Sequence, residues 1–393
     1  MDIHKVAEKY GDYQINMRRY FHQNPELSWK EYNTSKVVKE ELDKIGVPWR
    51  SCGGETGVLA TIQGQKPGKT ILIRGDMDAL EVEEKTGLPY ASRYNGVMHA
   101  CGHDCHTSMM LTAAHILQDM RDDLCGTVKL AFQPAEEMVE GAVAMIREGA
   151  LDGVDGCFAI HVWSDIESGR VFCAAGPEMA SSDHFIIDVM GKGGHGAAPH
   201  QCIDAGIASC AIISDLQTIV SRELPPLSPA VVTVGTVEVG NRWNCIPETA
   251  HIEGTCRAFT RDIRDSFAER IERIASTTAS AFRASAKSEY IKLVGPTVND
   301  AGMAAIVQNA SRKVVSPDAP ISMPPVTGGE DFAYFIERVP GAVALLGVRS
   351  EACGSTWPQH SNRYCVDESM LIRGAMLYAQ VAMDFNAGST AVE

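Results

Sequence analysis

The sequence contains no apolar run that approaches the roughly 20 residues a membrane-spanning helix needs. It is also short of positive charge, with 35 lysine and arginine residues against 50 acidic ones and a formal net charge of −15. Surfaces that bind nucleic acids are usually basic, so this balance argues against DNA or RNA as a partner. The opening stretch, MDIHKVAEKYGDYQINMRRYF, carries charges throughout and lacks the apolar segment of a secretory signal peptide. We therefore expect a cytoplasmic protein whose partners include neither a nucleic acid nor a membrane.

The chain has 12 cysteines, a number that invites a disulfide interpretation. That interpretation fits poorly, because the cysteines lie inside apolar segments of a long chain, as in ASCAIISDL, DGCFAIHV and VFCAAG. We expect most of them to be buried, reduced thiols that pack as small hydrophobic residues.

The length of 393 residues exceeds the usual size of one compact domain, and 45% hydrophobic residues supply enough core for two. Four short apolar runs have the composition of buried parallel strands. They are TILIRG, TVKLAFQ, GCFAIHV and AVALLGV, beginning at Thr70, Thr127, Gly156 and Ala342. Helical patterns separate the first three runs, which predicts an α/β fold with a mostly parallel sheet and helices on both faces. An earlier helix, TSKVVKEELDKIG (34–46), is expected to begin at a Thr or Ser cap and to end at Gly46.

The middle of the chain follows a different pattern, in which strands alternate in the antiparallel manner around two helices. The predicted strands are 181–193, 230–240, 249–260 and 288–295, and the helices are 204–223 and 266–285. The order βαββαβ is that of a small split-βαβ module. We therefore predict an α+β domain of residues 180–292, inserted into a first domain made of 1–179 and 293–393. The last residues, NAGSTAVE, are expected to form a loose tail.

Side chains that bind metals follow each of the four apolar runs, and in open α/β sheets ligands bind beyond the carboxyl ends of the strands. They are Asp76 and Asp78, Glu136 and Glu137, His161, and His360, and a predicted helix start adds Cys101 and His103. Any one of these residues would ordinarily be a cap, a turn residue or a core histidine. Together, thiolate, imidazole and carboxylate form a set suited to divalent metals, Zn²⁺ or Mn²⁺ first.

Five such ligands exceed what one catalytic tetrahedral ion needs. They predict two ions about 3.5–4 Å apart, bridged by one ligand. One of Glu136 and Glu137 would bind metal, and the other would move the proton of the attacking water. Spacing alone leaves open which glutamate does which. Asp78 is expected to orient a ligand through a hydrogen bond.

Ten stretches spread over the whole chain carry a family resemblance. They are RRYFHQNPELSWKEYNT, RGDMDAL, GVMHACGHDCHTSMML, FQPAEE, GAVAMIREGAL, AIHVW, GKGGHGAAPH, NCIPETAHIEGTCRAF, GGEDFAYF and HSNRYCVDE. In these stretches the chain resembles the aminoacylase-type amidohydrolases, the metallopeptidase family of hippurate hydrolases, auxin–amino-acid conjugate hydrolases and bacterial N-acyl amino acid deacylases. The resemblance implies a catalytic domain with a dinuclear metal centre, holding Mn or Zn by preference and Ni or Co as alternatives. It also implies that the inserted domain is a lid that mediates homodimerisation.

The resemblance assigns roles to individual residues. Cys101 and His103 in ACGHD would be metal ligands, with the Cys101 thiolate as the bridge, and Glu137, His161 and His360 would complete the set. Glu136, the first glutamate of PAEE, would be the general base.

In the lid, the resemblance implies that His195 of GGH steadies the tetrahedral intermediate, with a reach across the dimer interface as one arrangement. Asn244 in NCIP and Arg257 in GTCR match positions associated with the carboxylate of the substrate, which an arginine can bind in a bidentate manner. After HVW the family often has proline, whereas this chain continues SDIESG. We expect these residues to form a loop that borders the site and affects substrate preference.

The implied reaction is hydrolysis of the amide bond of a small N-acyl amino acid. Three alternatives stay open: deacetylation of N-acetyl-diaminopimelate, cleavage of dipeptides or of carboxy-terminal residues, and a non-catalytic metal-binding relative. A redox pair of Cys101 and Cys105 is disfavoured, because the spacing is C-x-x-x-C rather than C-x-x-C. His106 is expected to be an ordinary polar residue at the start of a helix.

Overall fold

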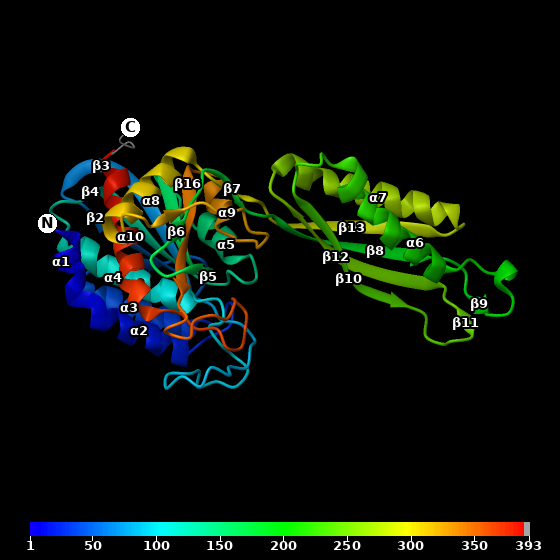
Figure 1. The fold of residues 1–393 in the computed structure, drawn as a ribbon, viewed down its shortest axis with the longest axis horizontal. Coiled ribbons are helices and arrows are strands. Elements are labelled where there is room, and N and C mark those ends of the chain that lie inside the picture. Colours follow the sequence, from blue (N-terminus) through cyan, green and yellow to red (C-terminus); the bar gives the residue numbers. More distant parts are fainter. Residues whose placement is uncertain (389–393) are drawn as a thin grey trace. The chain divides into compact units, whose positions relative to one another are not determined.

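A computed structural model describes residues 1–388, which form two compact units (Figure 1). Unit 1 comprises Met1–Glu178, Val298–Pro324 and the chain from Asp331 onward, and unit 2 comprises Met179–Thr297 and Pro325–Glu330. The predicted division instead assigned Met179 and residues 293–297 and 325–330 to the first domain. The segment 325–330 joins unit 2 through backbone contacts that no local pattern reveals, since the N–H of Ala180 donates to the carbonyl oxygens of Val326 and Gly328. Part of the predicted tail, residues 389–393, lies outside the described residues.

Unit 1 contains an eight-stranded sheet in the order β1-β2-β4-β3-β5-β16-β6-β15. The strands are β1 (Trp49–Ser51), β2 (Val58–Gln63), β3 (Lys66–Asp76), β4 (Cys125–Gln133), β5 (Gly156–Glu167), β6 (Val171–Phe172), β15 (Pro320–Ile321) and β16 (Gly341–Arg349). The central strands β4, β3, β5 and β16 run parallel to one another. These four are the strands that the apolar runs predict, so the predicted sheet is confirmed.

Helices cover both faces of this sheet, with α4 and α10 on one side and α5 and α9 on the other (Figure 1). The helices of unit 1 are α1 (Ile3–Ala7), α2 (Gly11–Gln23), α3 (Tyr32–Ile45), α4 (His103–Asp119), α5 (Gly141–Arg147), α8 (Ala301–Val314), α9 (Ala333–Ile336) and α10 (Leu371–Asn386). Alternation along β3 accounts for the two layers. Ile71 and Ile73 join the core cluster that includes α4 and α10, whereas Arg74 points to the opposite face and the ring of Phe332.

Two local expectations differ from the structure. Helix α3 begins at Tyr32, before the predicted Thr or Ser cap, because the Glu26 carboxylate accepts the backbone N–H groups of Asn33 and Thr34 at 2.9 and 2.7 Å. It ends as predicted at Gly46, whose φ of 74° suits glycine. The residues directly after HVW are part of a strand and do not form the predicted loop. They extend β5 to Glu167, which pairs with Arg349 of β16.

Unit 2 is a four-stranded antiparallel sheet in the order β10-β12-β8-β13, with two helices packed against it. In chain order its main elements are β8 (Ser182–Met190), α6 (Ala205–Thr218), β10 (Ala230–Val239), β12 (Thr249–Ala258), α7 (Arg261–Ala281) and β13 (Ser285–Val294). This is the βαββαβ order predicted from the sequence. The short strands β9 (Gly194–His195) and β11 (Cys245–Ile246) form a separate ribbon, and β7 (Gly176–Met179) and β14 (Thr297–Asn299) lie where the chain passes between the units.

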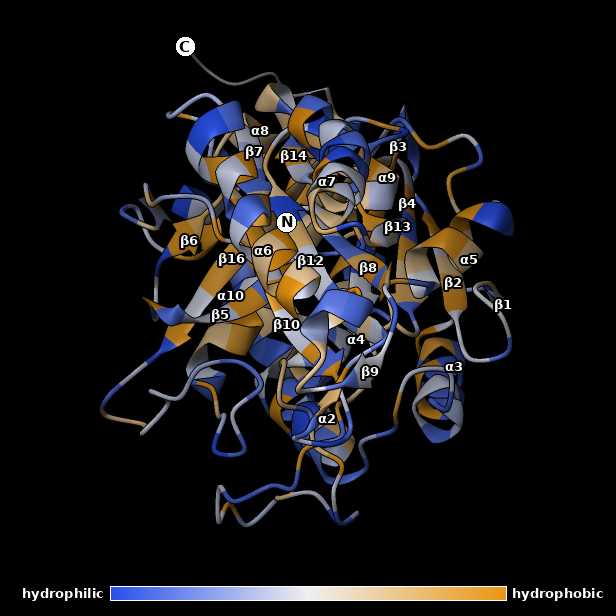
Figure 2. Cartoon of the chain, turned by 90° about the vertical axis from the view of Figure 1, so that its right-hand side faces the viewer, coloured by the Kyte–Doolittle hydropathy of each residue, from blue (hydrophilic) through white to orange (hydrophobic). Residues whose placement is uncertain are grey.

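Apolar residues concentrate in the strands and on the inner faces of the helices, as the hydrophobic colour along β2 in Figure 2 illustrates. Between residues 1 and 388, no helix has both the length and the apolar character that crossing a bilayer requires. All twelve cysteines are free thiols, and seven of them are buried, as expected of thiols that pack as small hydrophobic residues.

Candidate metal centre

The predicted metal ligands lie together at the carboxyl-terminal edge of the sheet in unit 1. Their donor atoms form two groups of three, and within each group all the atoms lie within 4.8 Å of one another. One group consists of Cys101, His103 and His161, and the other of Cys101, Glu137 and His360. Cys101 belongs to both groups, so its sulfur occupies the position of a shared donor.

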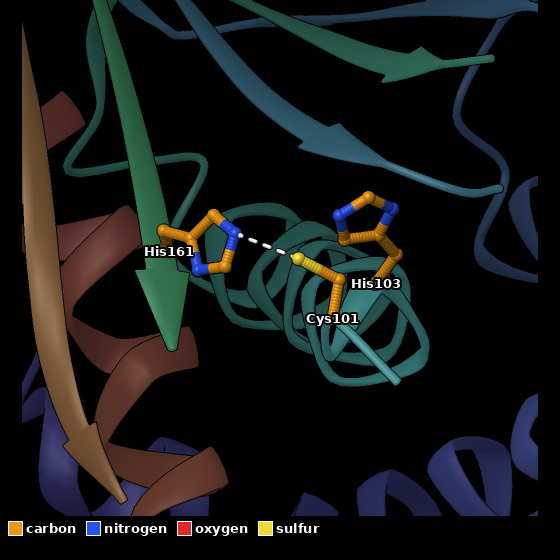
Figure 3. Close-up of side chains that lie close together, drawn as sticks. All are labelled: Cys101, His103 and His161. Atoms are coloured by element: carbon orange, nitrogen blue, oxygen red, sulfur yellow. Dashed lines mark hydrogen bonds between the residues drawn. The ribbon is translucent and has the colours of Figure 1, made fainter. Parts of the chain in front are cut away.

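Cys101 and His103 take their positions from the turn that starts α4. Gly102 between them has a φ of 93°, and a Cβ atom there would lie 2.4 Å from a methyl carbon of Val162, so this tight turn requires glycine. The turn directs the Cys101 sulfur toward β5, where it lies 3.5 Å from Nε2 of His161 (Figure 3).

Hydrogen bonds determine which ring nitrogen of each buried histidine carries the proton. Nδ1 of His161 donates to the carbonyl oxygen of Val162 at 2.7 Å. Nδ1 of His103 faces two acceptors, the carbonyl oxygen of Asp78 at 2.9 Å and its Oδ1 at 3.2 Å. In the neutral form of both rings Nε2 therefore keeps its lone pair, and in His103 that nitrogen is buried without a hydrogen-bond partner. Each ring is thus oriented as a neutral metal ligand is.

Glu137 and His360 complete the second group. Oε1 of Glu137 lies 3.7 Å from Nε2 of His360 and 3.9 Å from Nε2 of His103, and it too is buried without a hydrogen-bond partner. His360 lies in the loop after β16. Its backbone N–H donates to the carbonyl oxygen of Ala100 at 2.8 Å, and this hydrogen bond holds it beside the start of α4. Its side chain is largely exposed.

The electrostatics of the cluster fit divalent cations. Burial raises the pKa of the Glu137 carboxyl and of the Cys101 thiol, because a buried anion lacks the solvation that water provides. Burial also lowers the pKa of His161, which keeps the imidazole neutral. A bound cation would stabilise the carboxylate and the thiolate. Nε2 of His103 and Oε1 of Glu137, the two atoms without a hydrogen-bond partner, are ligand atoms to which such a cation would bind.

The remaining predicted residues of unit 1 lie beside these donors. Oε2 of Glu136 is 4.0 Å from Nε2 of His103, and its side chain is buried. Asp78 contacts His103 through Oδ1 and accepts the backbone N–H of Glu137 on Oδ2 at 3.1 Å.

His106 is a part of the site that the sequence interpretation missed, and it contacts Asp76, which that interpretation had included among the side chains beyond strand ends. Nε2 of His106 accepts the N–H of Val162 at 2.9 Å, and its Nδ1 donates to Oδ1 of Asp76 at 2.5 Å. Both ring nitrogens are therefore used, so His106 links β3 to β5 and has no lone pair left for a metal. The signal available in the sequence was the i, i+3 spacing of His103 and His106, which places them on one face of α4.

The other predicted residues belong to unit 2. His195 is exposed on β9 and pairs with Cys245 of β11, which brings it next to Asn244. Nδ1 of His195 accepts the N–H of Ala197 at 3.0 Å, so Nε2 of the neutral ring carries the proton and points to no acceptor of its own chain among residues 1–388. Arg257 lies apart from this pair, half-buried on β12, and burial lowers its pKa.

A mostly parallel sheet that gathers thiol, imidazole and carboxylate side chains at its carboxyl edge defines a candidate site for divalent metal ions. The chain belongs to the peptidase family M20/M25/M40, whose family model matches residues 72–384. It is accordingly a hydrolase that acts on amide bonds.

Relatives match over nearly the whole chain. Thermostable carboxypeptidase 1 of Saccharolobus solfataricus is 40% identical over 379 residues, which cover 95% of this chain and 96% of the relative. N-acetyl-L-cysteine deacetylase of Bacillus subtilis is 40% identical over 365 residues, or 92% and 85% of the two chains. A solved Bacillus subtilis structure, described as a dinuclear metal binding peptidase from the M20 family, has a TM-score of 0.86 at 33% identity and covers 97% and 99%.

Proposed function

We propose that the protein is an amidohydrolase that uses two divalent metal ions to cleave the amide bond of N-acyl amino acids. The observation that carries this proposal is the sharing of Cys101 between two groups of three donors, because each group would hold one ion and the Cys101 thiolate would be available to both. The solved relative that is described as a dinuclear metal binding peptidase supports the same number of metal ions. In this scheme Cys101, His103 and His161 would hold one ion, and Cys101, Glu137 and His360 would hold the other, with Mn or Zn as the expected metals and Ni or Co as alternatives.

Bound metal ions of this kind polarise a substrate carbonyl and lower the pKa of water. Glu136 supplies the proton transfers: its carboxylate takes a proton from the attacking water and then delivers it to the leaving amine nitrogen. The position of Glu136 beside His103 supports this role. Asp78 keeps the His103 ring in its ligand orientation.

The residues of unit 2 would act on the substrate. The Nε2–H group of His195 is available to donate to the developing oxyanion, because Nδ1 is already occupied by Ala197. Asn244 and Arg257 would bind the carboxylate of the amino acid, a role for which the guanidinium group is well suited.

We further propose that unit 2 is a lid and that it mediates a homodimer in the cytoplasm. Strand β10 is the end strand of its sheet, and Val237 and Val239 on it are exposed. Unit 2 also exposes the large apolar side chains of Ile207, Leu227 and Trp243. An open strand edge with nearby apolar residues is typical of a surface that another chain covers.

A second candidate is carboxypeptidase or dipeptidase activity, which the name of the Saccharolobus relative favours. Its chemistry is the same, because the bond broken is again an amide next to an amino acid. The two candidates differ only in the acyl side of the substrate.

The test is an assay of the full chain, loaded with Mn²⁺ or Zn²⁺, on N-acetyl, N-benzoyl and indole-acetyl amino acids, N-acetyl-diaminopimelate and dipeptides. We expect hydrolysis of N-acyl amino acids and two metal ions per chain by elemental analysis. The Glu136→Gln variant should keep both ions and lose nearly all turnover. A metal-loaded protein that hydrolyses none of these substrates would indicate the non-catalytic alternative, and full activity of Glu136→Gln would refute its role as the base.

A further inference from the structure

We propose that Glu31 is a positioning residue for the glutamate pair of the site, because its buried carboxylate fixes the backbone that leads into Glu136 and Glu137. The inference rests on the proposed function, in which Glu136 is the base and Glu137 a metal ligand. Glu31 lies more than a hundred residues before that pair in the sequence, at the start of α3. Three observations support it.

The first observation is the conformation of the loop that carries the pair. Ala135 has a φ of 49° and Val139 a φ of 60°, so left-handed residues flank the two glutamates on both sides. Residues with a Cβ rarely adopt this region, and a β-branched valine is especially unfavourable there. Such a conformation persists only where surrounding contacts hold it. Glu136 and Glu137 therefore depend on the anchors of this loop for their directions.

The second observation is the set of contacts that Glu31 makes. Its Oε1 accepts the backbone N–H of Ala135 at 2.9 Å and that of Trp29 at 3.0 Å. Its Oε2 accepts the hydroxyl of Thr56 at 2.9 Å. Glu31 and Ala135 are both fully buried. The hydrogen bond to Ala135 thus acts on the left-handed residue that immediately precedes Glu136, in a place where water does not compete.

The third observation is that the neighbours of Glu31 hold the same part of the site. The Ser28 hydroxyl donates to Oδ2 of Asp78 at 2.7 Å, and that oxygen also accepts the N–H of Glu137. The Trp29 indole N–H donates to Oε2 of Glu140 at 2.8 Å, just beyond the loop. Residues 28–31 therefore form a clamp on the glutamate loop, and Glu31 provides its contact closest to the base.

Glu26 offers a matched control on the same segment. Its carboxylate also accepts three hydrogen bonds, from the N–H groups of Asn33 and Thr34 and from the Thr34 hydroxyl, and none of these reaches residues 135–139. Removing the Glu26 carboxylate weakens the start of α3, whereas the Glu31 carboxylate makes no capping hydrogen bond to that helix and its loss releases the loop. A merely structural role for Glu31 predicts equal effects of the two changes.

The experiment compares Glu31→Ala, Glu31→Asp, Glu31→Gln and Glu26→Ala in the full chain. Hydrogen exchange of residues 134–140 is measured on metal-free protein, followed by metal stoichiometry and by kcat and KM. We expect Glu31→Ala and Glu31→Asp to speed exchange in the loop, to weaken retention of the second metal ion, and to lower kcat about 10–100-fold with little change in KM. Glu31→Gln should retain most of kcat, because its side-chain oxygen still reaches the N–H of Ala135. Glu26→Ala should lower the melting temperature without these effects.

Wild-type exchange and two retained ions in Glu31→Ala would overturn the proposal. So would a Glu31→Asp variant that behaves like the wild type while Glu31→Gln fails, since charge rather than reach would then matter. If Glu31→Ala does not fold, the contrast between the aspartate and glutamine variants carries the test. A wild-type protein that hydrolyses none of the substrates would overturn the proposed function, whereas the exchange and metal measurements would still decide the role of Glu31.

Discussion

Asp78 lies behind His103, with its carbonyl oxygen 2.9 Å and its Oδ1 3.2 Å from Nδ1 of the ring. Its second carboxylate oxygen accepts the backbone N–H of Glu137 at 3.1 Å. His103 belongs to one group of three donors and Glu137 to the other. A single carboxylate thus supports both halves of the candidate centre without being a donor in either group.

Replacing Asp78 by alanine should weaken the binding of both metal ions. The ring of His103 would lose its carboxylate acceptor and keep only the backbone carbonyl oxygen at position 78, and the N–H of Glu137 would lose its partner, so both donors would become less well oriented. We expect metal affinity to fall about 10–100-fold, measured by competition with a chelating dye, with activity partly restored at high metal concentration. Ser28→Ala is the control, since it removes one hydrogen bond to Asp78 and leaves the His103 contact in place. Unchanged affinity in Asp78→Ala would contradict this role.

Removing the metal should inactivate the enzyme and expose Cys101 to reagents. Cys101 is only 9% exposed, and in the proposed centre its sulfur is bound to both ions. We expect chelation to abolish activity and to lower the melting temperature, because ligands present at 1,000 times their Kd contribute about 4 kcal/mol to stability. Mass spectrometry after alkylation should find Cys101 modified only in the metal-free form. The exposed Cys210 is the internal control and should react equally in both forms. Equal labelling of Cys101 with and without metal would argue against its role as the bridge.

His195 provides a test of whether the proposed dimer completes its own active sites. If His195 acts on the partner's substrate, a mixed dimer of Glu136→Gln and His195→Ala chains contains one intact site, although each variant alone is inactive. Random exchange of subunits should then restore about one quarter of wild-type activity. If His195 acts within its own chain, both sites of the mixed dimer stay defective. Mixing the variants after mild dissociation and assaying the product separates the two cases, and size-exclusion chromatography with light scattering reports whether a dimer exists.

The parts of the fold that the sequence predicts are those encoded locally. The strands β3, β4, β5 and β16 are continuous apolar runs because both faces of the sheet are covered. The alternation in β8 and β12 reflects one face packed against α6 and α7. For the site, side chains beyond strand ends and the family resemblance together pointed to all five proposed ligands, and the structure brings their donor atoms together in unit 1.

The features that the sequence did not reveal depend on contacts between distant residues. Nothing near Glu31 indicates that its carboxylate reaches Ala135, and nothing near Ala135 indicates a left-handed residue. The local sequence pattern does not reveal the cap that Glu26 provides for α3 for the same reason. The accepting carboxylate lies outside the usual capping position. Long-range hydrogen bonds of this kind carry no periodic signal.

Glu178 leads to a prediction about pH and stability that does not involve the metal centre. Burial raises the pKa of its carboxyl to about 9, and hydrogen bonds from the backbone N–H of Ala174 and the side-chain amide of Asn299 only partly oppose this. Its Oε1 is buried without a hydrogen-bond partner. The folded protein therefore keeps this carboxyl protonated at neutral pH, whereas the unfolded chain ionises it near its ordinary value of 4.5.

The direction in which stability changes with pH follows from the number of protons that the folded and unfolded states bind. Between pH 4.5 and about 9 the folded state binds one proton more than the unfolded state, so the contribution of Glu178 to stability is full below pH 4.5 and is lost as the pH rises through 9. Glu178→Gln stays neutral at every pH. The stability of the wild type relative to this variant should therefore fall by about 1.4 kcal/mol per pH unit across that window. The slope of the stability difference against pH is measured by urea unfolding of both proteins in the presence of a chelator. The measurements run between pH 6 and 9, roughly the window over which the buried carboxyl stays protonated. Parallel curves for the two proteins would show that the carboxyl ionises normally in the folded state.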